Sequence, residues 1–243
     1  MSRLVLGLQA VREAVRVRGK ALTRVLVESG GGPKLDALAR FATDQGAPVE
    51  RVSRSDLDRR AAGGRHQGVI AFAPELELVH PSKLVVGPDT LLVALDGVMD
   101  PQNFGAVLRS AVALGATGVI WPEHASAPLS AATFRASAGA VEHATLCRVG
   151  SLTGALADLA ARGARTVVLD AQAPRALHEV DLTGPLVIVI GSEDKGARRT
   201  VRRAGELVRL PMAGPLDSLN ASVAAALALY EARRQRTVAA IPA

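Results

Sequence analysis

Four polar side chains follow one apolar run near the middle of the chain, at a spacing that suits a reaction site. The run, residues 91–95, is short and rich in branched side chains, as in a buried strand. Asp96 and Asp100 follow the run, Asn103 comes next, and Arg109 stands six residues further on. Polar groups held at the carboxyl end of a buried strand commonly form the site of an α/β sheet. We therefore expect a site where this strand ends.

Alternating strand and helix patterns in residues 91–243 indicate the elements that position this site. Pro101 disfavours a helix running through residue 100, and apolar spacing from Asn103 onward favours a helix. Strands are expected at 91–95, 118–121, 144–148, 165–169, 186–190 and 206–210, and helices at 103–114, 130–138, 152–162 and 218–235. This alternation is typical of a mainly parallel sheet covered on both faces. The pattern alone predicts an ordinary Rossmann-like sheet.

Two glycine-containing loops follow two of the expected strands, at residues 191–196 (GSEDKG) and 210–214 (LPMAG). The first is not a phosphate-binding P-loop, since no Ser or Thr follows Lys195, and no G-x-G follows the strand 91–95. Because glycine lets a backbone approach a ligand closely, the two loops could hold an adenosine through main-chain groups. The alternative interpretation is that these glycines only make turns.

The excess of positive charge is confined to the first third of the chain. The protein has 243 residues and a net charge of +6; residues 1–74 contain 13 Lys and Arg against 7 Asp and Glu, whereas residues 75–243 contain 16 of each. A nucleic-acid partner would explain such a basic unit, although solvated charge in an arginine-rich protein would also give it. Residues 74–90 hold three prolines and little periodicity. We therefore expect a basic domain 1–74, a linker 75–90 and a domain 91–243.

Residues 1–74 are expected to fold as a small α/β unit. The apolar spacing from Val5 to Val15 favours a helix. Ser55 is a candidate cap for a short helix whose exposed side carries Arg59 and Arg60. Strands are expected at 24–28, 49–52 and 69–72, and a further helix face at 35–42.

Composition bounds the remaining possibilities. Apolar residues make up 49% of the chain and aromatic residues only 2%, so the core must consist of Ala, Val and Leu. The single cysteine, Cys147, lies in an apolar run and is expected to be buried and inert. No signal peptide, no apolar run of the ~18–20 residues that span a membrane, and no metal-binding His/Cys cluster is visible. The sequence predicts a cytoplasmic protein that uses no metal.

Several motifs together resemble one protein family. The pattern D-x-x-x-D-P-x-N-x-G-x-x-x-R of residues 96–109 resembles the first signature of the SPOUT RNA methyltransferases, in their SpoU/TrmH group of ribose 2′-O-methyltransferases. Residues 190–196 and 210–224 resemble the later signatures, in the same order. Residues 7–13 (G-x-x-x-V-x-E) and 66–69 (HQGV) resemble the RNA-binding domain of the RlmB branch, which methylates a guanosine of 23S rRNA. The resemblance covers nearly the whole chain.

The resemblance implies a fold and a cofactor that the apolar pattern does not show. It implies that the carboxyl-terminal α/β domain contains a deep trefoil knot and that this knot holds S-adenosylmethionine. It also implies a homodimer formed through that domain, with part of each site supplied by the partner subunit. The expected cofactor contacts, carried over residue by residue, are Gly191, Gly196, Leu210, Met212 and Leu219.

The resemblance also implies the catalytic residues, which are Asn103, Arg109, Glu193, Ser218 and Asn220. Arg109 is expected to hold the target phosphate or ribose and to stabilise the alkoxide, because deprotonating a guanidinium at pH 7 costs roughly 7 kcal/mol. The alternative is an ordinary surface arginine. Glu193 could position Arg109 or Asn103, or accept a proton. Asn103 could cap its helix, bond the ribose, or both. Ser218 and Asn220 are expected to begin the last helix, where free N–H groups favour an anion.

The expected function is methyl transfer from S-adenosylmethionine to the ribose 2′-OH of a nucleotide in structured RNA, in particular a guanosine of 23S rRNA. A tRNA ribose methyltransferase and an antibiotic-resistance rRNA methyltransferase remain open. A non-catalytic RNA-binding scaffold is a further alternative, but it would need neither Arg109 nor Glu193. The sequence identifies neither the methylated nucleotide nor the proton acceptor.

Overall fold

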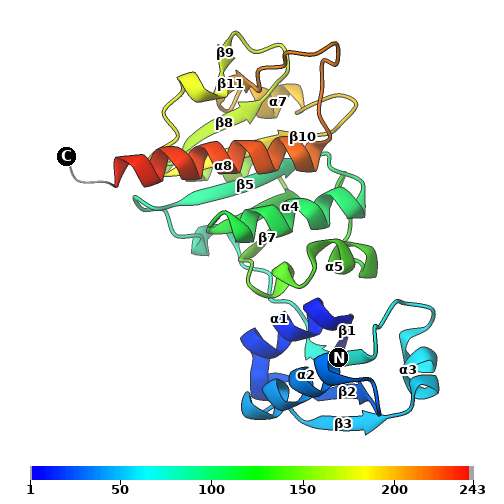
Figure 1. Ribbon diagram of the computed structural model, residues 1–243. Helices are drawn as coiled ribbons and strands as arrows, with labels where there is room; N and C mark the ends of the chain where they lie inside the picture. The colour runs from blue at the N-terminus through cyan, green and yellow to red at the C-terminus, as the bar shows by residue number, and fades with distance from the viewer. Residues whose placement is uncertain (1, 241–243) are drawn as a thin grey trace. The chain divides into compact units, whose positions relative to one another are not determined.

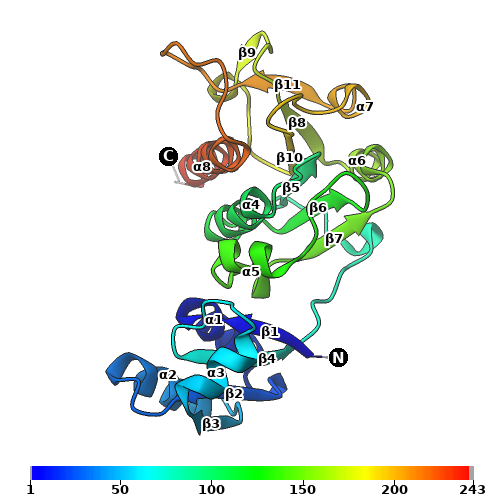
Figure 2. The ribbon, with the colours of Figure 1, turned by 90° about the vertical axis from the view of Figure 1, so that its right-hand side faces the viewer.

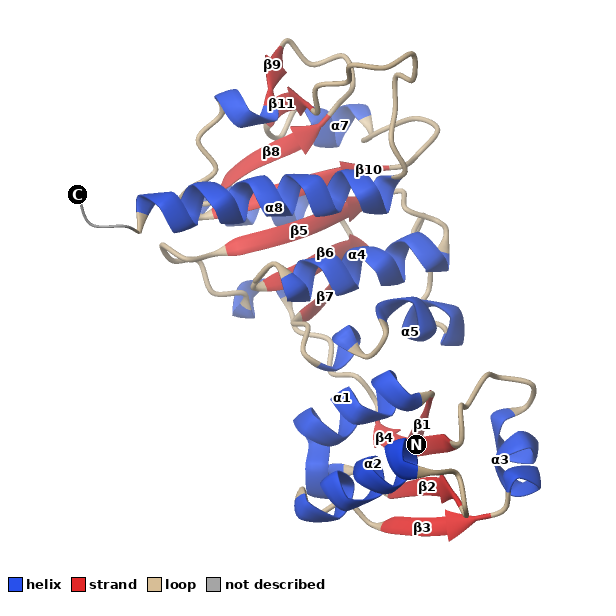
Figure 3. Cartoon of the chain, in the orientation of Figure 1, coloured by secondary structure: helices blue, strands red, loops and turns tan. Residues whose placement is uncertain are grey.

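The computed structural model describes residues 2–240, which form two compact units (Figure 1). The first unit runs to Glu77 and also includes Ala138–His143. The second consists of Leu78–Ser137 and the chain from Ala144 onward. Each unit consists of one sheet with helices packed against it (Figure 3).

The first unit has a four-stranded sheet in the order β1-β4-β2-β3. Its strands are β1 (Ser2–Leu6), β2 (Arg24–Glu28), β3 (Val49–Val52) and β4 (Val69–Pro74). Val25 and Val27 pack with the helices α1 (Leu8–Arg18) and α2 (Pro33–Asp44), whereas Leu26 packs with α3 (Arg54–Ala61). Because side chains alternate across a strand, α3 covers the opposite face of the sheet from α1 and α2.

The expected helix over Val5–Val15 is wrong in its first part. The strand β1 pairs with β4, and Gly7 then turns the chain at a φ of 94° before α1 begins. A positive φ suits glycine, so the turn separates two elements whose apolar residues read as one helical pattern. Helix α3 is capped by Ser53, which accepts a hydrogen bond from the Asp56 N–H, and not by Ser55.

The second unit has a seven-stranded sheet in the order β7-β6-β5-β10-β8-β11-β9, and all its pairings within the described residues are parallel. The strands are β5 (Leu91–Asp96), β6 (Gly118–Pro122), β7 (Leu146–Val149), β8 (Arg165–Leu169), β9 (Arg175–Ala176), β10 (Leu186–Gly191) and β11 (Glu206–Arg209). The predicted parallel α/β architecture is confirmed. The two-residue strand β9 has too little apolar sequence to be predicted.

Helices cover both faces of this sheet (Figure 2). One face carries α4 (Pro101–Ala113), α5 (Ala131–Ser137) and α8 (Ala221–Ala239), and the other carries α6 (Leu152–Ala161) and α7 (Arg199–Arg202). Short 3-10 helices lie at Gly19–Ala21, Pro81–Lys83, Ala140–Glu142 and Leu177–Glu179. Cys147 is buried under α6, as expected, and burial raises the pKa of its thiol to about 11. None of the helices within residues 2–240 is long and apolar enough to cross a membrane.

Most of the segment expected as a linker, residues 75–90, packs within the second unit. The Val79 N–H donates to the Leu146 carbonyl at 2.8 Å, and Leu84 is buried in the core below α6. Arg162 of α6 donates to the carbonyls of Pro81 and Leu84. Residues 78–90 are therefore bound to the sheet of the second unit and do not form a free linker.

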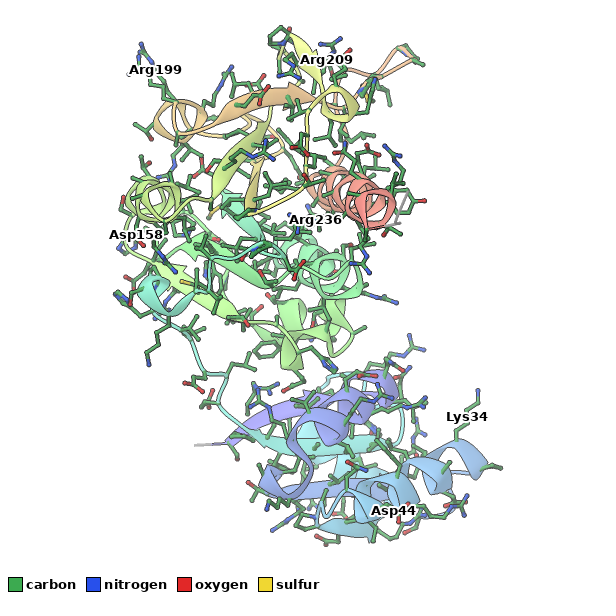
Figure 4. All side chains as sticks on the ribbon, turned by 90° about the vertical axis from the view of Figure 1, so that its left-hand side faces the viewer. Lys34, Asp44, Asp158, Arg199, Arg209 and Arg236 are labelled. Atoms are coloured by element: carbon green, nitrogen blue, oxygen red, sulfur yellow. The ribbon has the colours of Figure 1, made fainter. Side chains whose placement is uncertain are left out.

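Arg236, labelled in Figure 4, lies near the C-terminal end of α8 and binds the segments that precede β5 and β10. Its guanidinium donates to the carbonyls of Asp89, Thr90, Leu182 and Gly184. Desolvation in this site lowers the pKa of Arg236. The four carbonyls hold the last helix over the central strands. The deep trefoil knot stays a prediction.

Candidate active site

The carboxyl ends of the central parallel strands meet at one edge of the second sheet. Gly191, the last residue of β10, lies in register with Asp96, the last residue of β5. The loops that leave these two strands therefore begin side by side. Sites on parallel α/β sheets form at such an edge, where neighbouring loops can hold one ligand.

The start of α4 is fixed by Asp100 and Pro101. The Asp100 carboxylate accepts hydrogen bonds from the N–H groups of Gln102 at 3.0 Å and Asn103 at 3.3 Å. Pro101 occupies the first helical position, where its missing N–H costs nothing. Asp100, not Asn103, is therefore the helix cap, and the Asn103 side chain is left available for the site.

The start of α8 is fixed by Asn220. Its Oδ1 accepts hydrogen bonds from the N–H groups of Ser222 at 2.9 Å and Val223 at 3.4 Å. The helix begins at Ala221, so Asn220 is its cap, and Ser218, which the sequence placed at the start of the helix, lies in the loop before it. The capping oxygen faces the helix, which leaves the Nδ2 of Asn220 free to donate elsewhere.

Three side chains that are far apart in the sequence converge at this edge. The Glu193 Oε1 accepts hydrogen bonds from the Nδ2 of Asn103, from the Nδ2 of Asn220 at 2.7 Å and from the Ala221 N–H at 3.4 Å. The Asn220 Nδ2 also approaches the Asn103 Oδ1 at 3.0 Å. We call Asn103, Glu193 and Asn220 the amide–carboxylate cluster. Its carboxylate lies at the start of α8, where the helix dipole favours negative charge.

A cavity of about 530 Å³ lies beside this cluster, at the ends of β8, β10 and β11. Its lining includes all five residues expected to contact the cofactor, together with Glu193 and Ser218. The five are Gly191, Gly196, Leu210, Met212 and Leu219. The structure thus brings these residues together around one space.

The two glycines also have a structural reason of their own. A Cβ on Gly191 would lie 2.1 Å from the Ala197 nitrogen, and Gly196 has a φ of +64°. Ser192 and Gly196 exchange backbone hydrogen bonds at 3.1 and 2.9 Å, which closes the loop on itself. The turn therefore requires glycine at these positions, and the same compact backbone forms one wall of the cavity.

The cavity fits a nucleoside-sized ligand. Its volume lies within the roughly 300–1,000 Å³ of small-molecule sites. Leu210, Met212 and Leu219 offer apolar contact for an adenine ring. Asp170 and Asp217 line the same cavity and supply acceptors of the kind that sugar hydroxyls or an ammonium group require.

Arg109 does not join the amide–carboxylate cluster within one chain. Its side chain is exposed on α4, lines neither this cavity nor the larger one beside it, and makes no hydrogen bond or ion pair with any residue of 2–240. Arg109 stands six positions after Asn103 in the helix, a rotation of about 240° beyond one full turn, so the two side chains point to different sides. Its catalytic role stays a prediction.

The contact between Asp96 and Arg198 is a feature that the motifs did not predict. Asp96 is 1% exposed, and its carboxylate accepts hydrogen bonds from the N–H and the Nε of Arg198, both at 2.7 Å. The bond ties the end of the glycine loop back to β5. The available signal was an acid directly after a buried strand, but nothing in the sequence named its partner 102 residues away.

Comparisons with known proteins define the class. Residues 90–230 match the SpoU rRNA Methylase family, and residues 4–79 match the RNA 2′-O ribose methyltransferase substrate binding family. The chain is 43% identical over 239 residues to a protein of Mycobacterium ulcerans named an uncharacterized tRNA/rRNA methyltransferase, a match that covers 96% of this chain and 77% of the relative. The chain therefore belongs to the SpoU methylase family.

Solved structures agree with this assignment. An RNA 2′-O ribose methyltransferase is 30% identical with a TM-score of 0.80, covering 97% of this chain and 89% of the other. An S-adenosylmethionine-bound rRNA methyltransferase from Sinorhizobium meliloti is 28% identical with a TM-score of 0.75, covering 96% and 87%. The protein is an S-adenosylmethionine-dependent RNA methyltransferase.

Proposed function

We propose that the protein methylates the ribose 2′-oxygen of a nucleotide in ribosomal RNA, with a guanosine of 23S rRNA as the expected target, in the cytoplasm. The observation that carries the proposal is the amide–carboxylate cluster directly beside the cofactor-sized cavity. The first unit supports an RNA substrate, because it matches a substrate-binding family and carries the excess of Lys and Arg.

The reaction sets three requirements on the protein. The ribose oxygen must lie in line with the methyl group, its proton must leave, and the developing alkoxide must be stabilised. S-adenosylmethionine, when bound by the residues around the cavity, supplies a methyl group activated by a positively charged sulfur. The protein must therefore orient the ribose and manage one proton.

The amide–carboxylate cluster suits this task. Glu193 fixes the amide groups of Asn103 and Asn220, whose remaining donors and acceptors can bind ribose hydroxyls. The Glu193 Oε2 makes no hydrogen bond with any residue of 2–240, so it is available to the 2′-OH. In this proposal the proton leaves to Glu193 or to a water beside it, and Arg109 stabilises the alkoxide from a second copy of the chain.

A homodimer through the second unit would provide that second copy. On α8 the side chains of Val223, Leu227 and Tyr230 recur at helical spacing and are 46%, 45% and 61% exposed. Helix α4, which carries the exposed Arg109, packs beside α8 on the same face of the sheet (Figure 1). In this proposal the second copy covers this stripe and extends over α4 to Arg109. Light scattering on Leu227→Glu should show monomers, with methyl transfer lost and cofactor binding kept.

The function is tested by incubating the protein with radiolabelled S-adenosylmethionine and unmodified rRNA or tRNA transcripts in separate reactions. We expect alkali-resistant ribose label in 23S rRNA, mapped to one nucleotide by nuclease digestion. Label in tRNA alone would instead support the alternative function, a tRNA ribose methyltransferase; the name of the M. ulcerans relative includes tRNA as well as rRNA. A protein that binds the cofactor but labels no ribose in either RNA would contradict the proposal.

A further inference from the structure

The net charge of residues 75–243 conceals a local basic segment. These residues carry equal numbers of positive and negative side chains, yet five of their sixteen Lys and Arg fall within nine positions of the chain. The five are Lys195, Arg198, Arg199, Arg202 and Arg203. They lie on the glycine loop that follows β10 and on α7. Opposite charges elsewhere in the unit balance the sum, but within residues 2–240 carboxylates pair with only two of the five, Arg198 and Arg202.

These five side chains line one cavity of about 1,120 Å³. We call it the basic cavity. It shares the wall formed by residues 192–196 with the cofactor-sized cavity, and its lining also includes Asn103 and Glu193 of the amide–carboxylate cluster. A nucleotide whose ribose reaches that cluster therefore has neighbouring nucleotides close to the basic cavity.

Two of the arginines are already paired with carboxylates. Arg198 is bonded to Asp96, and Arg202 forms an ion pair with Asp170 at 2.6 Å. Arg198 and Arg202 are four residues apart, so they share one side of α7, turned toward the ends of β5 and β8. These pairs fix α7 against the sheet.

The side chains of Arg199 and Arg203 have no carboxylate partner. Both side chains are exposed, and neither guanidinium makes a hydrogen bond or an ion pair with any residue of 2–240. They too are four residues apart, which places their Cβ atoms roughly 5–6 Å from each other on the second side of the helix. Figure 4 shows the Arg199 side chain extending outward from α7.

The carboxylates that line the basic cavity leave these arginines without partners. Asp96 is bonded to Arg198, Asp100 caps α4, and Glu193 binds the two amides. Asp194 is the one lining carboxylate with no bond among the described residues. A site of paired acids and unpaired guanidinium groups fits an anion, and the planar guanidinium fork matches the oxygens of a phosphate.

We propose that the basic cavity binds phosphodiester groups of the RNA next to the nucleotide that is methylated, through Arg199 and Arg203. This inference rests on the proposed function, since it places the target ribose at the amide–carboxylate cluster. It adds an RNA-contacting site to the methyltransferase unit itself, beyond the basic first unit. The flanking phosphates enter with the target nucleotide because they are covalently joined to it.

The experiment compares full-length wild type with the double variant Arg199→Ala/Arg203→Ala. Binding to an unmodified 23S rRNA transcript is measured by filter retention at several salt concentrations. Two lost contacts to single-stranded phosphates should reduce the slope of log affinity against log salt by about 1.4. The wild-type advantage should then shrink roughly sevenfold between about 50 and 200 mM salt. S-adenosylmethionine affinity by calorimetry and kcat at saturating RNA should stay within about twofold, because neither residue lines the cofactor-sized cavity.

Two further variants control the comparison. Lys83→Ala/Arg148→Ala removes the same charge from the second unit outside the basic cavity, and it should leave the slope at its wild-type value. Arg199→Lys/Arg203→Lys keeps the charges and should recover most of the slope, because lysine also binds phosphate as a point charge. All variants should melt at nearly the wild-type temperature.

The inference is overturned if the Ala double variant binds the transcript with wild-type affinity and slope. A second outcome concerns millimolar pyrophosphate at matched ionic strength. The inference is also overturned if pyrophosphate binds wild type and not the double variant, yet displaces RNA equally from both proteins. The site would then bind a free phosphate compound and not the RNA. Failure of the proposed function is distinguishable: wild type would bind RNA with the steeper slope and yet transfer no methyl group.

Discussion

Replacing Glu193 separates its two possible roles, positioning and proton acceptance. The Glu193 Oε1 receives the amides of Asn103 and Asn220 and the Ala221 N–H. Glu193→Gln keeps a carbonyl oxygen that can accept the same bonds, whereas Glu193→Ala removes the acceptor. If Glu193 acts by positioning, Gln should preserve much of the turnover that Ala loses.

The size of each effect follows from the contacts. A hydrogen bond to a charged group contributes about 1.5–3 kcal/mol to stability in general. Because this cluster is exposed to water, we expect each of its bonds to contribute about 1.5 kcal/mol or less. Losing the acceptor leaves Asn103 and Asn220 free to move by an ångström, a misplacement that can cost ~100-fold in rate. Gln loses mainly the charge assistance, about 1 kcal/mol or roughly fivefold.

Single-turnover methyl transfer with both variants, measured across pH, tests this reasoning. The expected order of rates is wild type, then Gln, then Ala, with S-adenosylmethionine affinity nearly unchanged. If Gln is as inactive as Ala and the pH–rate profile loses its acidic limb, then Glu193 is the general base and positioning is not its main role. That outcome would refute positioning as the main role of Glu193 and would make its carboxylate the proton acceptor.

Three other predictions follow from the fold. Arg109→Ala and Arg109→Lys should both fold and bind S-adenosylmethionine as wild type does, yet lose most turnover. Lysine should restore little activity because it lacks the planar guanidinium fork. Near-wild-type turnover in Arg109→Ala would show that Arg109 is an ordinary surface arginine. Removing residues 1–77 should keep cofactor affinity in calorimetry but weaken RNA binding and flatten its salt dependence, and an unchanged slope would contradict this. Cys147, with a pKa of about 11, stays a protonated thiol at pH 8, so Ellman's reagent should react with it only after denaturation; rapid reaction of the folded protein would show that it is accessible.

The sequence predicted the elements of the second unit well because each buried parallel strand is a short run of branched residues. It failed at β1, where Gly7 divides a strand from a helix whose apolar residues share one apparent period. The sequence also predicted a helix beginning at Ser218. In the structure α8 begins at Ala221, because the Asn220 side chain caps its first N–H groups. Such errors are local, since a single turn residue decides each of them.

The site was predictable in its members but not in its geometry. The motifs gave Asn103, Glu193 and Asn220 as candidates, yet the bonds among them span 27 to 117 residues and depend on which strands lie side by side. A linear motif likewise gives the spacing from Asn103 to Arg109 without weighing their directions around the helix axis. The basic cavity could not be predicted from the net charge of residues 75–243, because a sum of charges does not show where the charged residues lie.

The order of strands has a consequence for how the protein is made. The two central strands, β5 and β10, pair residues 91–96 with residues 186–191. A ribosome must therefore synthesise and release 95 further residues after Leu91 before the first residue of β10, the partner of β5 on the side away from β6, exists. Until then β5 exposes an apolar edge that can pair with another chain. Closing so large a loop also slows folding. We expect the nascent second unit to depend on chaperones more than the first unit, whose sheet is complete by Pro74.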